Sequence, residues 1–235
     1  FRILYPIFDP NFIFDSYSSR LTKGTHRSIE KLETIVKKNS RNYKRQVWAM
    51  KIDAVKFFDS IDHQILFEML SGKIECPKTL NLLKIIIDSF SAKPGKGIPL
   101  GNIYLDPLDK FAKHKLKIKN YNRFCDDIII LKDSNDFREW REKLSLFADR
   151  ELKLQLKFSE PVKLKNGFDW LGFVLLPYHK VLRTKTKKRM FCRLENQFCK
   201  PQFEASLSSY LGLLKHCNSF KLRSQLAQKF DLLFE

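Results

Sequence analysis

The alternation of apolar and polar residues predicts strands in three parts of the chain. Val47–Val55 alternates β-branched and aromatic residues with polar ones, which is typical of a strand that ends at Asp53 or just beyond it. Tyr121–Leu131 has the pattern of two strands joined by a tight turn, and Asp126 and Asp127 lie at that turn. Phe168–Leu176 is apolar and strand-like.

Apolar residues at helical spacing predict most of the remaining regular structure. In Ser28–Lys38 a stripe of Ile29, Leu32, Ile35 and Val36 opposes a charged face. We expect further helices over His63–Leu70 (with Asp62 as N-cap), Leu80–Phe90, Ile103–Leu116, Phe137–Glu151 and from Phe203 onward, the last with Leu207, Tyr210, Leu211 and Leu214 on one face. Lys93–Gly101, the densest cluster of Gly and Pro, and the basic segment Lys37–Arg45 predict loops.

This order of strands and helices predicts an α+β body followed by a small helical subdomain, with the break between Pro177 and Pro201. The length of 235 residues and the hydrophobic fraction of 43% support one large domain or two packed subdomains. No stretch approaches the roughly 20 apolar residues that span a bilayer, and the first residues lack the pattern of a signal peptide. We therefore expect no membrane partner.

The net charge of the chain indicates which class of molecule it binds. The formal net charge of +18 is typical of a protein that meets a polyanion, above all a nucleic acid backbone. A basic surface that only keeps the protein soluble is the open alternative. The five Cys form no CxxC pair, which favours a reduced intracellular compartment over a disulfide framework and does not favour a zinc site. The five His form no ligand pattern.

The aspartates at the strand ends carry the candidate chemistry. Asp53, alone, is as readily a cap or turn residue, and Asp126–Asp127 alone is as readily a hairpin turn. Together they meet the requirement of two-metal phosphoryl transfer, which needs hard oxygen ligands around two ions about 3.5–4 Å apart. Mg²⁺ prefers a few carboxylates with water and substrate phosphates. The sequence therefore predicts a site for two Mg²⁺ ions, for which Mn²⁺ can substitute.

These segments resemble bacterial reverse transcriptases of the group II intron-like and retron superfamily. In that family a strand ends in the first catalytic Asp, and a hairpin carries an aromatic-x-Asp-Asp box, here Phe124-Cys125-Asp126-Asp127 with Phe for the usual Tyr. Phe58, five residues after Asp53, matches the steric gate that excludes ribonucleotides. The resemblance implies an RNA-directed DNA polymerase that makes cDNA from a template RNA, with dNTPs and a DNA or RNA primer as partners.

The resemblance covers essentially the whole chain and implies a right-hand polymerase fold. Its fingers portion would be residues 1–46, its palm, an antiparallel sheet with helices, residues 47–177, and its basic connection and helical thumb residues 178–235. The implied dNTP contacts are Arg20, Lys23, Phe58, Gly97 and Pro99. The implied primer and template contacts are Gly24, Thr25, His26, the primer grip at Leu171 and Gly172, and the basic residues Lys185, Lys187, Lys188 and Arg189. Lys157 is a weaker match to a lysine that protonates pyrophosphate, and we expect it to be a surface residue.

The tail Ser209–Arg223 is similar to the thumb of reverse transcriptases from diversity-generating retroelements. That subgroup implies error-prone copying at template adenines, a small basic accessory variability protein, possibly oligomeric, as partner, and a cytoplasmic enzyme of bacterial or phage origin. Other bacterial reverse transcriptases (intron-like, retron or phage-defence) and a non-catalytic RNA-binding scaffold of the same fold are the alternatives. A basic helical protein of membrane surfaces gives the Asp residues no role.

Two departures from the family pattern concern the fingers. The family has a short Ser-Gln-containing segment between the loop that ends at Gly101 and the stretch matching Asn102–Leu105, and here the two are joined directly. The first finger strands are also missing before Phe1. Either a deletion has removed part of the dNTP pocket or the sequence lacks these residues for another reason, and we favour the second interpretation.

Overall fold

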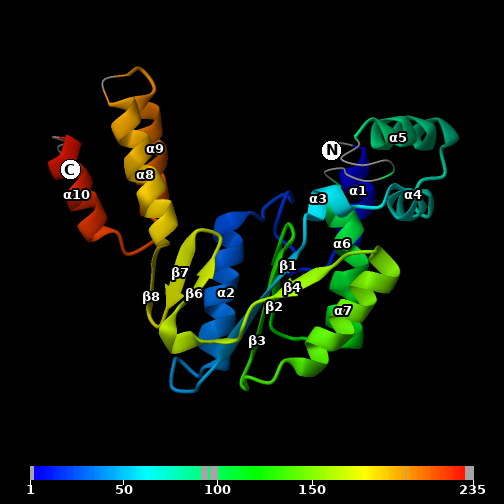
Figure 1. Ribbon diagram of the computed structural model, residues 1–235, viewed down its shortest axis with the longest axis horizontal. Coiled ribbons are helices and arrows are strands. Elements are labelled where there is room, and N and C mark those ends of the chain that lie inside the picture. Colours follow the sequence, from blue (N-terminus) through cyan, green and yellow to red (C-terminus); the bar gives the residue numbers. More distant parts are fainter. Residues whose placement is uncertain (1–2, 91–94, 96–99, 199, 231–235) are drawn as a thin grey trace.

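The computed structural model describes residues 3–90, 95, 100–198 and 200–230 (Figure 1). Its strands are β1 (Trp48–Ala54), β2 (Tyr121–Phe124), β3 (Asp127–Lys132), β4 (Leu156–Phe158), β5 (Val162–Lys163), β6 (Phe168–Trp170), β7 (Phe173–Leu176) and β8 (His179–Leu182). Its α-helices are α1 (Leu4–Phe8), α2 (Thr25–Asn39), α3 (Phe57–Ser60), α4 (His63–Ser71), α5 (Pro77–Ser89), α6 (Gly101–Lys110), α7 (Arg138–Leu152), α8 (Thr184–Gln197), α9 (Phe203–Leu214) and α10 (Phe220–Phe230).

The centre of the molecule is an antiparallel sheet of five strands in the order β2-β3-β1-β4, with β5 also paired to β1. The pairing of β1 with β3 runs from Trp48 opposite Lys132 to Ile52 opposite Ile128. The expected strand over residues 47–55 and the expected strand-turn-strand over residues 121–131 are therefore confirmed. This register brings the end of β1 and the β2–β3 turn to the same edge of the sheet.

Helices cover both faces of this sheet, which is why its strands are apolar on both sides. On one face Met50 and Ile52 pack with residues of α6 and α7, among them Leu108 and Leu144. On the other face Ala49, Ile129 and Leu131 pack against the buried stripe of α2, Ile29, Leu32, Ile35 and Val36. Because successive strand residues point to opposite faces, Lys51, Asp53 and Asp127 share the α2 face, beyond the apolar part that α2 covers.

A second sheet, β6-β7-β8, joins this body to the C-terminal helices α8, α9 and α10 (Figure 1). The apolar segment 168–176 is therefore a hairpin with its turn at Leu171 and Gly172. β8 pairs with β7 from Phe173 opposite Leu182 to Leu176 opposite His179. Backbone pairing in this sheet continues past Pro177, where the expected palm ends, and that boundary stays a prediction.

Helix α2 lies within the expected fingers portion and packs directly on the central sheet. Its apolar face is buried against β1 and β3. The expected helix over residues 103–116 is two pieces, since α6 ends at Lys110 and Phe111–Lys115 continues as a π-helix. Asp62 caps α4 as expected, and its carboxylate accepts from the backbone N–H of Gln64 and Ile65.

In the part of the chain that the structure describes, none of the helices combines the length and apolar character that a membrane crossing requires.

Candidate active site

Three aspartates from two segments meet at one edge of the central sheet. Asp53 is the penultimate residue of β1, Asp126 lies in the β2–β3 turn, and Asp127 begins β3. The register that places Ile52 opposite Ile128 puts Asp53 beside Asp127 at the next position. The turn itself needs Cys125 in the left-handed region, with φ of 58°. The structure thus places the three residues expected to bind metal at the same edge of the sheet.

The carboxyl groups of this cluster disturb one another electrostatically. Partial burial, the charge of Asp126 and a hydrogen bond with Asp126 raise the pKa of Asp53, and Lys157, its partner across the strand pair, opposes this rise. Partial burial, then Asp126 and Asp53, raise the pKa of Asp127, against the opposing effect of Lys51 and Arg183. Like charges held this close favour the protonated form unless a cation relieves them.

The donor set fits Mg²⁺ and does not form a closed metal cage. In the described residues no three His, Cys, Asp or Glu side chains are grouped closely enough to hold an ion by themselves. Asp53 and Asp126 are within hydrogen-bond reach of each other, while Asp127 lines a separate pocket. Mg²⁺ is commonly bound by one or two carboxylates with water and substrate phosphates completing its shell. Such an open pair is therefore compatible with the expected ions.

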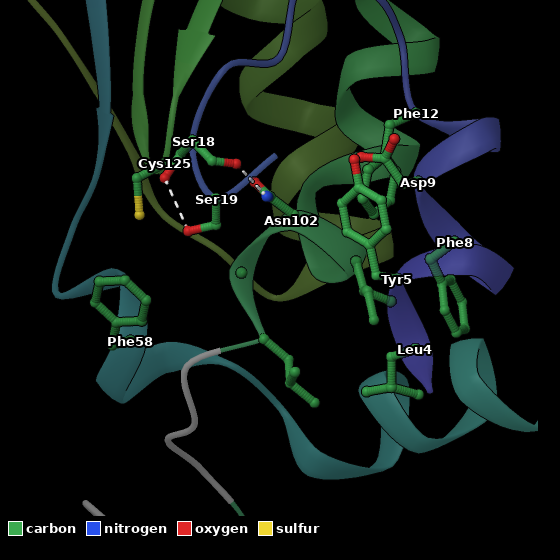
Figure 2. Close-up of a pocket in the computed structure, with 13 residues that line it drawn as sticks. Leu4, Tyr5, Phe8, Asp9, Phe12, Ser18, Ser19, Phe58, Asn102 and Cys125 are labelled. Carbon is green, nitrogen blue, oxygen red and sulfur yellow. Dashed lines mark hydrogen bonds between the residues drawn. The ribbon is translucent and has the colours of Figure 1, made fainter. Parts of the chain in front are cut away.

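Phe58 and Cys125 line a pocket of about 420 Å³ next to this cluster (Figure 2). Ser18, Ser19 and Asn102 line it as well. The Phe58 ring is 43% exposed and packs at 5.1 Å between centroids on Phe57, which is buried. The Phe58 ring is therefore supported on one side by Phe57 and forms part of the pocket wall on the other. Its expected role as a steric gate stays a prediction.

A second pocket, of about 410 Å³, joins Asp127 to the β6–β7 turn. Leu171 and Gly172, the expected primer grip, line it together with Lys51, Arg183 and Arg189. The turn takes its shape from φ of 47° at Leu171 and 87° at Gly172. The expected primer grip residues and one expected metal ligand thus share a single cavity whose walls carry three cationic side chains.

The guanidinium of Arg20, an expected dNTP contact, is hydrogen-bonded within its own segment in this structure. Its Nε donates to Asp9 at 2.6 Å, and Nη1 donates to the carbonyls of Ile13 and Ser16 at 2.7 and 3.1 Å. Nη2 donates to the carbonyl and the carboxylate of Asp9. The side chain is only 9% exposed. Arg20 therefore stabilises its own loop, because its guanidinium N–H groups are bound by the Asp9 carboxylate of the same segment.

The other expected contacts of this segment, Lys23, Gly24, Thr25 and His26, do not line the Phe58 pocket. The Lys23 ammonium donates to the Phe14 carbonyl at 2.8 Å and lies 3.3 Å from the centre of the Phe14 ring. Gly24 is the N-cap of α2 with φ of 108°, and Thr25 begins the helix. The His26 ring stacks on the His216 ring at 3.6 Å between centroids. His26 thus joins α2 to the segment between α9 and α10.

Two expected contacts, Gly97 and Pro99, lie outside the described residues. Lys185 and Lys188 are exposed on α8, Lys187 is half-buried there, and Arg189 reaches the second pocket. Sequence reasoning missed Lys51 and Arg183 as walls of that pocket. The position of Lys51, two residues before Asp53 in a strand, signals that both share one face. Arg183 has no such signal, because only the hairpin sheet brings it near Asp127.

No protein-family model matches the chain, and no curated protein matches it in sequence. Its fold is similar to telomerase, a reverse transcriptase. Telomerase of Candida tropicalis in complex with the TWJ fragment of telomeric RNA is 12% identical, with a TM-score of 0.57 over 90% of this chain and 44% of that chain. For Candida albicans telomerase, also with a TWJ fragment, the values are 10% identity, TM-score 0.55, and coverage of 82% and 40%. For apo telomerase of Candida tropicalis they are 12%, 0.56, 84% and 43%.

The chain spans less than half the length of these telomerase chains. At such low identity the likeness concerns the fold alone. The chain has a reverse-transcriptase-like fold.

Proposed function

We propose that this protein is the polymerase core of a reverse transcriptase, which copies RNA into DNA by two-metal nucleotidyl transfer. The observation that carries the proposal is the contact of Asp53 with Asp126 at the edge of the sheet, where the charge of Asp126 helps to raise the pKa of Asp53. Two carboxylates held this close disfavour each other's charge, so the pair offers no gain in stability. A divalent cation bound with a triphosphate would offset the repulsion between the two carboxylates.

The residues around the pair have roles that follow from their positions. Asp53, Asp126 and Asp127 would hold two Mg²⁺ ions, which when bound activate the primer 3′-hydroxyl and neutralise charge on the triphosphate. Phe58 excludes nucleotides with a 2′-hydroxyl from the pocket that it lines. Leu171 and Gly172 support the primer end beside Asp127, and Lys51, Arg183 and Arg189 provide positive charge for its phosphates.

An RNA template fits the overall charge and the fold. The net charge of +18 provides the phosphate-binding surface that a duplex requires. Two telomerase structures of similar fold contain a fragment of telomeric RNA. The exposed basic residues of α8, Lys185 and Lys188, extend this surface toward the C-terminal helices, which correspond to the thumb in this proposal.

The subtype proposed is a retroelement enzyme that diversifies sequences by error-prone copying, with a small basic accessory protein, in a bacterial or phage-infected cytoplasm. Its support is the resemblance of Ser209–Arg223 to the thumb of that subgroup. In the structure this stretch includes the end of α9, the start of α10 and the turn between them. The Cys217–Ser219 part of that turn is held to β8 of the second sheet, because the backbone N–H of Asn218 donates to the Lys180 carbonyl at 2.8 Å.

Primer extension tests the function. The full-length protein would be given an RNA template, a DNA primer, dNTPs and Mg²⁺, with and without its co-purifying partner and RNA, and the products would be sequenced. DNA with frequent changes at template adenines would support both the polymerase and the retroelement subtype. Faithful cDNA would keep the polymerase and favour an intron-like, retron or defence enzyme. RNA binding without synthesis under any condition would overturn the proposal in favour of a scaffold.

A further inference from the structure

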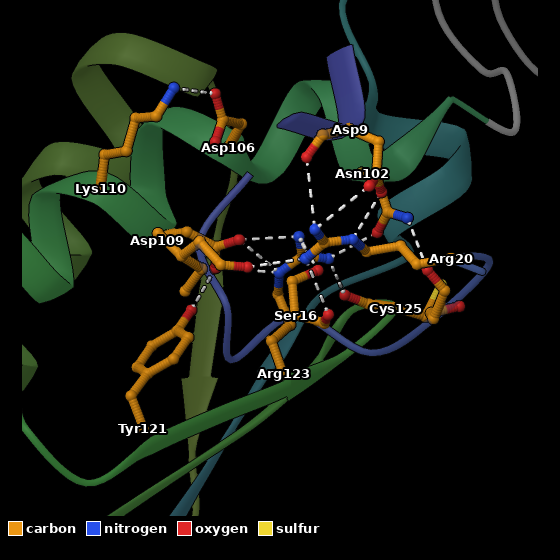
Figure 3. Close-up of polar contacts among 12 residues, drawn as sticks. Asp9, Ser16, Arg20, Asn102, Asp106, Asp109, Lys110, Tyr121, Arg123 and Cys125 are labelled. Atoms are coloured by element: carbon orange, nitrogen blue, oxygen red, sulfur yellow. Dashed lines mark hydrogen bonds and ion pairs between the residues drawn. The ribbon is translucent and has the colours of Figure 1, made fainter. Parts of the chain in front are cut away.

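Arg123 is a fully buried cation at the end of β2, two residues before the Cys125 turn (Figure 3). Its Nε lies 2.9 Å from both carboxylate oxygens of Asp109, and its Nη2 donates to the same carboxylate at 2.7 Å. Nη2 also donates to the Ser16 hydroxyl at 2.9 Å. Nη1 donates to Asn102 Oδ1 at 2.9 Å and to the Cys125 carbonyl at 2.8 Å. All five N–H donors of the guanidinium are therefore used.

The partner of this cation is equally enclosed. Asp109 of α6 is fully buried and also accepts from the Tyr121 hydroxyl at 2.6 Å. Burial lowers the pKa of Arg123, but the charge of Asp109 and its hydrogen bonds oppose this effect. The pKa of Arg123 is raised as a result. A buried ion pair contributes little net stability compared with an apolar pair of similar volume. We therefore look for the role of the Arg123–Asp109 pair in the neighbouring groups that it holds in place.

The geometry fixes the turn that carries Asp126. Cys125 has a left-handed backbone, with φ of 58°, which is unfavourable for a residue with a side chain. Its carbonyl is held by Arg123, so the peptide that leads into Asp126 has a defined direction. The same Nη1 holds Asn102, whose amide donates to the Ser18 carbonyl at 2.7 Å. Cys125, Asn102 and Ser18 all line the Phe58 pocket.

We propose that Arg123 is a positioning residue that couples the metal-binding turn to the wall of the nucleotide pocket. It touches neither metal nor nucleotide, and it acts through the Cys125 carbonyl and through Asn102. This inference rests on the proposed function, because it assigns Asp126 to a metal ion. It predicts that the site depends on the several N–H donors of the arginine guanidinium and not only on a buried positive charge.

The substitution Arg123→Lys separates these two requirements. A lysine keeps the charge opposite Asp109, but its single ammonium with three donors cannot reach Asp109, Cys125, Asn102 and Ser16 together. We expect Mn²⁺ affinity, measured by the EPR signal of free ion without substrate, to fall about 10- to 100-fold, which is the usual effect of losing a residue that orients metal ligands. With substrates, kcat should fall by a similar factor while primer–template affinity stays at the wild-type value.

Tyr104→Phe provides the control for lost stability alone. The Tyr104 hydroxyl is fully buried on the same helix and donates to the Leu152 carbonyl at 2.7 Å, away from the metal-binding turn. This variant should lower the melting temperature and leave Mn²⁺ affinity unchanged. If Arg123→Lys does not fold, Asn102→Ala removes one of the two acceptors at Nη1 and should still weaken Mn²⁺ binding about tenfold.

The outcomes separate this inference from the proposed function. Wild-type Mn²⁺ affinity in Arg123→Lys, or in Asn102→Ala where the first variant is unfolded, overturns the positioning role even if the enzyme makes DNA. A wild-type protein that binds Mn²⁺ and loses it in Asp126→Asn, yet makes no DNA, overturns only the polymerase, and the Arg123→Lys comparison still decides. A wild-type protein that binds no Mn²⁺ overturns both.

Discussion

The indole N–H of Trp170 donates to the hydroxyl of Ser28 at 3.0 Å, across 142 positions of sequence. Ser28 in turn donates to Asn122 Oδ1 at 2.7 Å, and the Asn122 amide donates back to the Ser28 carbonyl at 2.9 Å. All three residues are buried. This network ties the hairpin that carries Leu171 and Gly172 to α2 and to β2, the strand before the Asp126 turn.

Replacing Ser28 by Ala tests that connection. It leaves the Trp170 N–H and one Asn122 acceptor unpaired in the interior, at a cost of about 2–3 kcal/mol. For a chain of this length such a loss lowers the melting temperature by roughly 5–10 °C, which calorimetry can measure. The exposed Ser208→Ala on α9 is the matched control and should change little. Equal melting temperatures for the two variants would contradict the role given to the network.

Replacing Asp126 by Asn tests the metal assignment. The amide cannot supply the negative charge that a divalent ion needs beside Asp53, so DNA synthesis should fall by about 10³-fold or more. RNA binding, measured by fluorescence anisotropy, should remain near wild type because the basic surface is unchanged. Asp136→Asn, an exposed carboxylate paired with Arg138, is the control. Full activity in the Asp126 variant would remove this residue from the site.

Replacing Phe58 by Ala should relax the choice of sugar. The ring is half exposed in the wall of the 420 Å³ pocket, and its removal leaves room for a ribose 2′-hydroxyl. We expect the preference for dNTPs over rNTPs, as a ratio of kcat/KM, to fall by about 10²-fold. Phe220→Ala removes an even more exposed ring on α10, at 80% exposure, and should keep the preference. An unchanged ratio in the Phe58 variant would argue against a steric gate.

The stacked rings of His26 and His216 predict a pH-dependent contact between the body and the C-terminal helices. Partial burial and then His216 lower the pKa of His26, Lys180 acts in the same direction, and Glu30 opposes them. A histidine with a depressed pKa stabilises the folded contact above its unfolded value of about 6.5, and this contribution is lost as the pH falls through the folded pKa. Below pH 6.5, amide exchange should therefore accelerate in the segment between α9 and α10.

Hydrogen exchange between pH 7.5 and pH 5 measures this effect, after correction for the intrinsic rates. His216→Gln should remove the extra pH dependence, since the second ring is gone. His179→Gln, on an exposed histidine whose ring meets only the Pro177 carbonyl among its described partners, should retain it. Identical pH profiles for wild type and His216→Gln would show that the stack does not titrate in this way.

The local pattern of the sequence was enough to place the two segments that carry Asp53, Asp126 and Asp127. Alternation over residues 47–55 predicts β1, and the Asp126–Asp127 pair between apolar runs predicts the β2–β3 turn, because both depend on neighbours within a few residues. The pattern is also enough for the buried stripe of α2. It was less accurate where one apolar run contained a turn, as at Leu171 and Gly172, where an apolar side chain adopts positive φ.

The partners of buried charges were decided by the tertiary structure alone. Arg20 is an expected phosphate ligand in the sequence, yet in the structure it closes a loop on Asp9. Nothing in the sequence indicates that Arg123 is enclosed with Asp109. Lys51 and Arg183 reach one cavity with Asp127 only because β1 and the hairpin sheet pack side by side. A side chain removed from water must find its acceptors wherever packing brings them, at any sequence distance. Short-range periodicity determines which face a residue occupies, and long-range packing determines what it meets there.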